Sequence, residues 1–209
     1  MNRRSILIAG FALALFAVAV GGAMTFIDSG QSDAVHTMPD GRVMTGATEH
    51  AAVPFDQAFI DAMVRHHQEA IEMAEAANER GLTQPDLRRI SDDIIGSQQR
   101  EIDQMLDWRE EWFGSRELGP VLPEALGVAE AELGMHHGSA DEVASAEDVD
   151  SRFASMMIPH HEGAVAMAEA ALERAQHEEL KQLSRAIIEA QEREIEIMRR
   201  HAQEAHHGG

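Results

Sequence analysis

The first strong pattern in the chain is an apolar stripe with helical spacing between residues 55 and 80. At about 100° per residue, one face of this segment collects Phe59, Met63, His66, His67, Ala70, Met73 and Ala74. The opposite face carries charged and amide side chains. The pattern predicts an amphipathic helix from Phe55 to about Arg80, ended by a left-handed Gly81.

Three more long helices are predicted from the same kind of spacing. They cover about Pro85 to Phe113, Glu147 to Gln176 and Glu178 to Ala205, and Pro85 suits the first turn of its helix. Residues 114–146 form a linker with Pro and Gly at several positions, in which Ala125 to Leu133 is expected to form a short helix.

The chain contains an internal repeat. The string FIDAMVRHHQEAIEMAEA at residues 59–76 recurs as FASMMIPHHEGAVAMAEA at residues 153–170, with Phe, one Met, the His pair, a second Met, Ala and Glu in register. The helices that follow repeat too, because residues 98–105 and 191–198 both read Gln-x-x-Glu-Ile-x-x-Met. Each half of the domain is therefore a helical hairpin.

Two such hairpins predict an all-α fold, a four-helix bundle over residues 54–207 with one repeat at 55–113 and the other at 147–207. Pro159 departs from the first repeat, where Arg65 stands. Because the residues around Pro159 keep the register of the repeat, we expect one continuous helix with a kink rather than a helix that begins at the proline.

The N-terminus has the pattern of an export segment. Arg3 and Arg4 precede an apolar run from Ile6 to about Ala23, so residues 1–27 are predicted to be a signal peptide or an uncleaved signal anchor. Residues 28–53, rich in Gly, Ser, Thr and Asp, are expected to be a flexible tether. With the two arginines inside, both alternatives place the domain outside the cytoplasm, secreted or anchored to the membrane.

Composition narrows the function. The formal net charge of −20 argues against nucleic acid as a partner, since a phosphate backbone needs a basic surface. Without cysteine there are neither disulfides nor thiolate metal sites. The 12 His and 12 Met residues remain as candidate soft metal ligands.

The candidate chemistry lies on the faces predicted to be buried. An imidazole there needs a partner, because burying an unpaired polar group is costly. We predict a metal site from the residues that recur in both repeats: Met63, His66, His67, Met73, Glu101, Met105, Met157, His160, His161, Met167, Glu194 and Met198. Taken singly, each Met is more simply a core residue, and each His and Glu a hydrogen-bonding group; the joint recurrence favours metal.

Ligand softness selects copper. Thioether and imidazole suit copper, with Met favouring Cu(I) and Cu(II) as the second option. A di-iron bundle needs Glu-x-x-His on two helices, whereas Met63 and Met157 stand three residues before His66 and His160.

The strings MMIPHHEGAVAMA at residues 156–168 and QEREIEIM at residues 191–198 resemble the bacterial family called domain of unknown function 305 (DUF305). The resemblance covers about residues 55–205. It implies a ferritin-like bundle and copper handling outside the cytoplasm, since the family includes periplasmic copper-binding proteins. The first repeat departs from the motif around its His pair, which leaves open whether both halves bind metal.

Three functions are therefore weighed. The leading hypothesis is an extracytoplasmic protein that buffers, sequesters or delivers copper ions and turns over no substrate, with an unidentified protein as copper acceptor and the membrane as a partner if the N-terminus is uncleaved. The second is a ferritin-like di-metal redox enzyme. The third is a metal-free, membrane-tethered interaction module. The number of metal ions and the oligomeric state are not determined by the sequence.

Overall fold

The computed structural model describes residues 35–37, 43–45, 53–135 and 138–207, with side chains for 53–135 and 138–201. The chain divides into two units, Met1–Glu49 and His50–Gly209. In the first unit, strands β1 (Val35–Thr37) and β2 (Val43–Thr45) pair antiparallel within the predicted tether, with Val35 opposite Thr45. The predicted signal or anchor at residues 1–27 lies outside the described residues. Among the helices that are described, none is both long and apolar enough to span a membrane.

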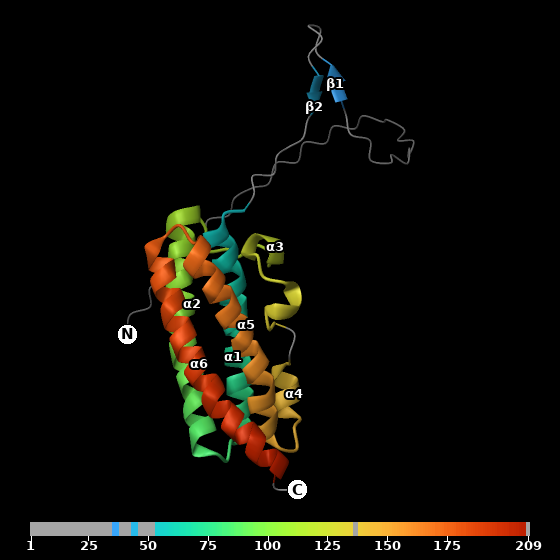
Figure 1. The fold of residues 1–209 in the computed structure, drawn as a ribbon, viewed down its shortest axis with the longest axis vertical. Helices are drawn as coiled ribbons and strands as arrows, with labels where there is room; N and C mark the ends of the chain where they lie inside the picture. The colour runs from blue at the N-terminus through green and yellow to red at the C-terminus, as the bar shows by residue number, and fades with distance from the viewer. Residues whose placement is uncertain (1–34, 38–42, 46–52, 136–137, 208–209) are drawn as a thin grey trace, which may run out of the picture. The chain divides into compact units, whose positions relative to one another are not determined.

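The second unit is a four-helix bundle, as predicted (Figure 1). Its long helices are α1 (Phe55–Arg80), α2 (Pro85–Phe113), α5 (Val149–Arg174) and α6 (Glu178–His207), all close to their predicted bounds. Helix α1 ends at Gly81, whose φ of 87° is left-handed and whose N–H bonds the carbonyl of Ala77. Helix α5 is continuous through Pro159, which confirms the expectation of one helix rather than a helix that begins at the proline.

The linker is more broken than the sequence suggested. The prediction of a single helix from Ala125 to Leu133 is wrong. Helix α3 covers only Pro123–Leu126 and ends at Gly127, which takes a left-handed φ of 70°. A 3-10 turn, η1 (Glu130–Glu132), follows. A further short helix that was not predicted, α4 (Ala140–Ala144), begins at Ser139, whose hydroxyl accepts from the backbone N–H of Glu142.

Equivalent aspartates of the two repeats fasten each hairpin to the turn of the other. Asp56 at the start of α1 accepts hydrogen bonds from the backbone N–H groups of Gln176 and His177, between α5 and α6. Asp150 at the start of α5 does the same for Thr83 and the following residue, between α1 and α2. The exchange is reciprocal, so the two hairpins are related by an approximate two-fold axis.

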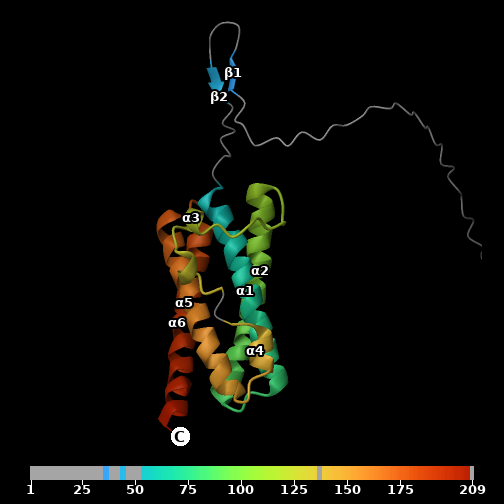
Figure 2. The ribbon, with the colours of Figure 1, turned by 90° about the vertical axis from the view of Figure 1, so that its right-hand side faces the viewer.

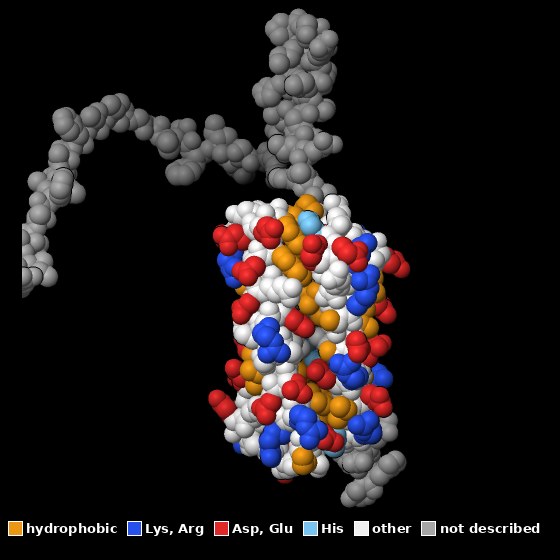
Figure 3. Space-filling view, turned by 90° about the vertical axis from the view of Figure 1, so that its left-hand side faces the viewer, with side chains coloured by type: hydrophobic (Ala, Val, Ile, Leu, Met, Phe, Trp, Pro, Cys, Tyr) orange, Lys and Arg blue, Asp and Glu red, His pale blue; other side chains and the backbone are white. Residues whose placement is uncertain are grey.

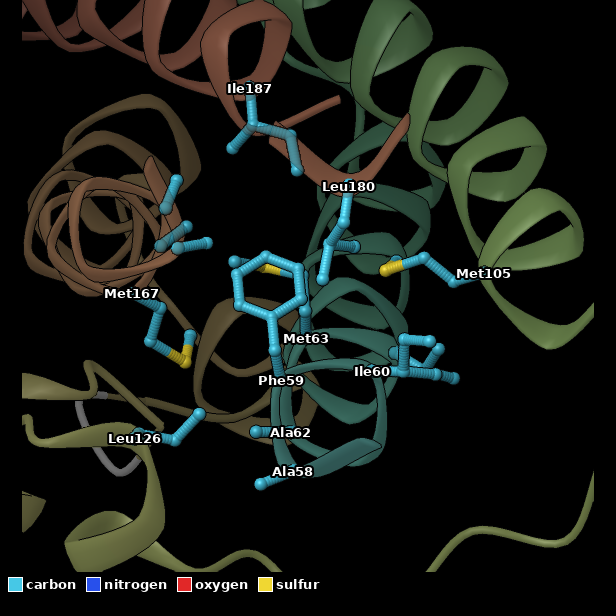
Figure 4. Packing of buried hydrophobic residues seen from close by; sticks show 14 of the residues in the cluster. Ala58, Phe59, Ile60, Ala62, Met63, Met105, Leu126, Met167, Leu180 and Ile187 are labelled. Carbon is cyan, nitrogen blue, oxygen red and sulfur yellow. The ribbon is translucent and has the colours of Figure 1, made fainter. Parts of the chain in front are cut away.

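The same reciprocity divides the apolar core into two clusters. Because α1 and α5 run antiparallel, the first half of α1 packs with the second half of α5, in one cluster that includes Phe59, Met63 and Met167 (Figure 4). The second half of α1 packs with the first half of α5, in a cluster that includes Met73 and Phe153. The polar residues of the predicted site lie between these clusters along both helices.

Candidate metal centre

The centre of the bundle is a pair of stacked imidazoles. His66 of α1 and His160 of α5 have ring centroids 3.7 Å apart with a tilt of 36°, and both side chains are buried. The two are equivalent positions of the repeat, so the pair lies at the approximate two-fold axis. Ala70 and Ala164, one turn beyond each, are fully buried and leave room for the helices to approach.

The other histidine of each doublet turns towards the following helix. His67 Nε2 lies 2.8 Å from the Glu101 carboxylate, and His161 Nε2 lies 2.7 Å from that of Glu194. A carboxylate accepts only, so Nε2 of each imidazole donates the proton and Nδ1 keeps its lone pair. Neither Nδ1 has a hydrogen-bond partner within the described residues. Each Glu thus orients an imidazole whose free lone pair can take a metal ion.

His66 is fully buried in the middle of the centre. Neither of its ring nitrogens makes a hydrogen bond with any described residue, although a nearby backbone carbonyl of His160 weakly favours its protonated form. Burial lowers the pKa of His66 well below its usual 6.5, and the neighbouring His160, His67 and His161 lower the pKa further. The imidazole is therefore neutral at physiological pH, as a metal ligand must be.

Thioethers flank the imidazoles on both sides. One core cluster contains Met63, Met105 and Met167, and the other contains Met73, Met157 and Met198. All six side chains are almost completely buried. Each methionine of the first set has its equivalent in the second set at the matching position of the other repeat. The bundle therefore holds two equivalent methionine triads, each with one residue from α1, one from α5 and one from α2 or α6.

The structure places the four predicted histidines at one level of the bundle, with a methionine triad in the core cluster on either side, and the predicted residues have two roles. The four histidines and six methionines lie inside, whereas Glu101 and Glu194 act on His67 and His161 by hydrogen bonds. In the part of the chain that is described, no three His, Asp or Glu side chains gather closely enough to hold a metal ion by themselves. The side chains buried at and beside this level offer imidazole and thioether donors, a set that suits copper.

Three residues of the centre were not among the predicted ligands. Gln98 and Gln191 are equivalent and buried, and their Oε1 atoms lack hydrogen-bond partners within the described residues. Their position three residues before each Glu, on the same helical face, is the signal that could have identified them. Glu69 Oε2 lies 3.6 Å from His160 Nε2. Its sequence position suggested only the solvated face of the helix.

The profile of the family described as "Domain of unknown function (DUF305)" matches residues 22–109 and 56–202. No curated protein matches the chain significantly. Several solved structures do match it.

Cu(I)-bound CopM is 35% identical with a TM-score of 0.59, over 71% of this chain and 96% of CopM. CopM has also been solved with Cu(II) and with silver. A putative secreted DUF305 protein from Streptomyces coelicolor is 26% identical with a TM-score of 0.60, over 71% of this chain and 91% of its own. A DUF305 fragment from Deinococcus radiodurans is 27% identical with a TM-score of 0.59, over 73% and 97%.

Proposed function

Because the chain belongs to the DUF305 family, and copper-bound CopM is among its structural relatives, we propose that it binds copper ions inside its bundle and buffers, sequesters or delivers them outside the cytoplasm. Copper is cargo in this proposal, and the protein turns over no substrate.

The observation that carries the proposal is a group of buried imidazole nitrogens that lack hydrogen-bond partners. Both nitrogens of His66, and Nδ1 of His67 and of His161, have no hydrogen-bond partner among the described residues. Leaving a buried polar atom unsatisfied costs about 1–3 kcal/mol. A neutral imidazole keeps one lone pair, so a soft cation could take one nitrogen of His66 together with Nδ1 of His67 or of His161, which accounts for the grouping of these histidines at one level of the bundle.

The donor chemistry supports copper over other metals. Imidazole nitrogens of the four histidines and sulfurs of the two methionine triads are the ligands that Cu(I) accepts, and an all-thioether face does not suit zinc, magnesium or calcium. In this proposal Glu101 and Glu194 fix the orientation and the tautomer of His67 and His161 rather than bind the ion.

The decisive experiment is an anaerobic titration of the domain with Cu(I) in competition with a chromophoric chelator. The triple variant His160→Ala, His161→Ala, Met167→Ala removes donors from one half of the centre and should bind at least tenfold more weakly, about 1.4 kcal/mol. His201→Ala, which removes an imidazole of α6 outside the centre, should leave the affinity unchanged. Equal affinities for wild type and the triple variant would refute the proposal.

Two further measurements separate the alternatives. Elemental analysis of the natively loaded protein should find copper; two iron or manganese ions per chain with little copper would favour the di-metal enzyme instead. Cu(I) that binds only the folded state should raise the melting temperature. A melting temperature unaffected by copper would favour the interaction module.

The extracytoplasmic location rests on the basic and apolar N-terminal pattern, together with the Streptomyces coelicolor relative that is described as a putative secreted protein. Fractionation of cells that express the full chain should recover the bundle outside the cytoplasm, and recovery in the cytoplasmic fraction would contradict this part of the proposal.

A further inference from the structure

An acidic groove runs along the surface between α1 and α4. It holds about 320 Å³, and its charged side chains are Glu72, Glu75 and Glu79 of α1 and Asp141 of α4. Its remaining lining residues are alanines, which keep it open. Helices α1 and α4 pack against each other, and Figure 2 shows α4 against the lower part of α1. We refer to this feature as the acidic groove.

The acidic groove is not neutralised. Within the described residues, no ion pair involves any of its four carboxylates. Another face of the bundle, in Figure 3, instead intersperses acidic side chains with Lys and Arg. The groove therefore concentrates positive ions locally, because unpaired like charges beside a low-dielectric wall focus the field.

Glu69 links the acidic groove to the interior. It lies one turn before Glu72 on α1, and its side chain is 37% exposed. Its Oε2 lies 3.6 Å from Nε2 of His160, whose ring stacks on the fully buried His66. Glu101 and Glu194 are more buried and hydrogen-bond His67 and His161. Glu69 is therefore open to solvent and lies beside His160, one member of the imidazole pair.

The approximate symmetry of the bundle is broken at this point. The residue equivalent to Glu69 in the second repeat is Gly163, and a Cβ added to Gly163 would lie 2.1 Å from the carbonyl oxygen of Leu133. The linker backbone thus covers the second approach to the imidazole pair. Glu69, at 37% exposed, is more open to solvent than Glu101 and Glu194, the carboxylates that hydrogen-bond His67 and His161.

Building on the proposed function, we infer that the acidic groove and Glu69 are the access route by which copper ions reach the His66–His160 pair. The groove attracts the hydrated or loosely chelated cation, and Glu69 takes it in transit to the imidazoles. Since Glu69 lies on the route and is not a permanent ligand, its removal should slow association and release together.

The test is the rate of Cu(I) transfer from a chromophoric chelator to the full chain, followed by stopped-flow absorbance in both directions. Glu69→Gln should slow both directions about tenfold, while the dissociation constant stays within about threefold of wild type. The triple variant Glu72→Gln, Glu75→Gln, Glu79→Gln should slow association and weaken its dependence on salt. Its charge-matched control is Glu111→Gln, Glu117→Gln, Glu124→Gln, on exposed carboxylates elsewhere, which should leave the rates near wild type.

The outcomes separate this inference from the proposed function. Normal rates in Glu69→Gln with intact copper affinity would overturn the access route alone. If Glu162→Gln, next to His161 on α5, slowed copper transfer and Glu69→Gln did not, copper would enter by a different route and the inference would be overturned. If the wild-type protein takes no copper from the chelator, the proposed function fails and the access route with it.

Discussion

The carboxylates behind His67 and His161 provide the most direct test of how the centre is organised. In wild type, Glu101 accepts the Nε2 proton of the fully buried His67 at 2.8 Å, which leaves Nδ1 as the free lone pair. The isosteric change Glu101→Gln keeps the volume but removes the charge, and its amide can also donate to Nε2, which moves the imidazole proton to Nδ1. The imidazole then spends part of its time with the wrong nitrogen available.

The expected magnitude follows from the burial of the pair. Removal of such an orienting group typically weakens metal binding 10–100-fold, about 1.4–2.7 kcal/mol. Because the Glu101 side chain is only 20% exposed, water replaces it poorly, and we expect the loss to exceed tenfold. Glu194→Gln should give a similar loss, since Glu194 holds His161 at 2.7 Å in the equivalent position.

The assay is the competitive Cu(I) titration, with circular dichroism of each variant to confirm that the helices are intact. Glu111→Gln is the matched control, because Glu111 is an exposed carboxylate on the same helix. A folded Glu101→Gln protein with wild-type copper affinity would refute the assignment of Glu101 as an orienting residue, and with it the assignment of His67 Nδ1 as a donor.

Three further predictions concern the stability of the metal-free protein. Because the pKa of His66 is lowered in the folded state, only the unfolded state takes up a proton at this residue just below about pH 6.5. The free energy of unfolding should therefore fall by up to about 1.4 kcal/mol per pH unit as the pH drops, until the folded pKa is reached. Urea unfolding of wild type and His66→Leu between pH 7.5 and pH 5 checks this. Asp56→Ala should cost about 2 kcal/mol in chemical denaturation, and Asp150→Ala less, because Asp56 is buried and Asp150 is partly exposed. Gly163→Ala should lower the free energy of unfolding by about 1–3 kcal/mol because its Cβ meets linker backbone, whereas Gly96→Ala on α2, with only an ordinary contact, should raise it by up to about 1 kcal/mol.

Each of these predictions has an outcome that contradicts it. An equally steep pH dependence in His66→Leu would assign the proton uptake to other groups. A larger loss at Asp150 than at Asp56 would show that burial does not decide the strength of these contacts. Equal effects at the two glycines would mean that the linker yields easily at α5.

Much of this protein was determined by the sequence itself. Helical periodicity located the four long helices, since an apolar stripe can be buried only if it keeps to one face, and the repeat of the His doublets required two similar hairpins. Gly81 and Pro85 marked a turn through backbone conformations available from the residue types alone. The candidate ligands were found in the same way, because polar donors on an apolar stripe are an exception that local spacing reveals.

Only the tertiary structure decided how these residues combine. Spacing along one helix does not give the direction of its neighbour, so the stack of His66 on His160 and the division of the methionines into two triads follow from the antiparallel crossing of α1 and α5. The role of Glu69 was hidden for the same reason, since its partner belongs to another helix. The helix predicted from Ala125 to Leu133 was also wrong, since Gly127 ends α3 early. Helix propensity is weak in this linker, so its conformation is decided by the contacts it makes with α5. Contacts between distant segments have no local signature, and they decide which lone pairs stay free.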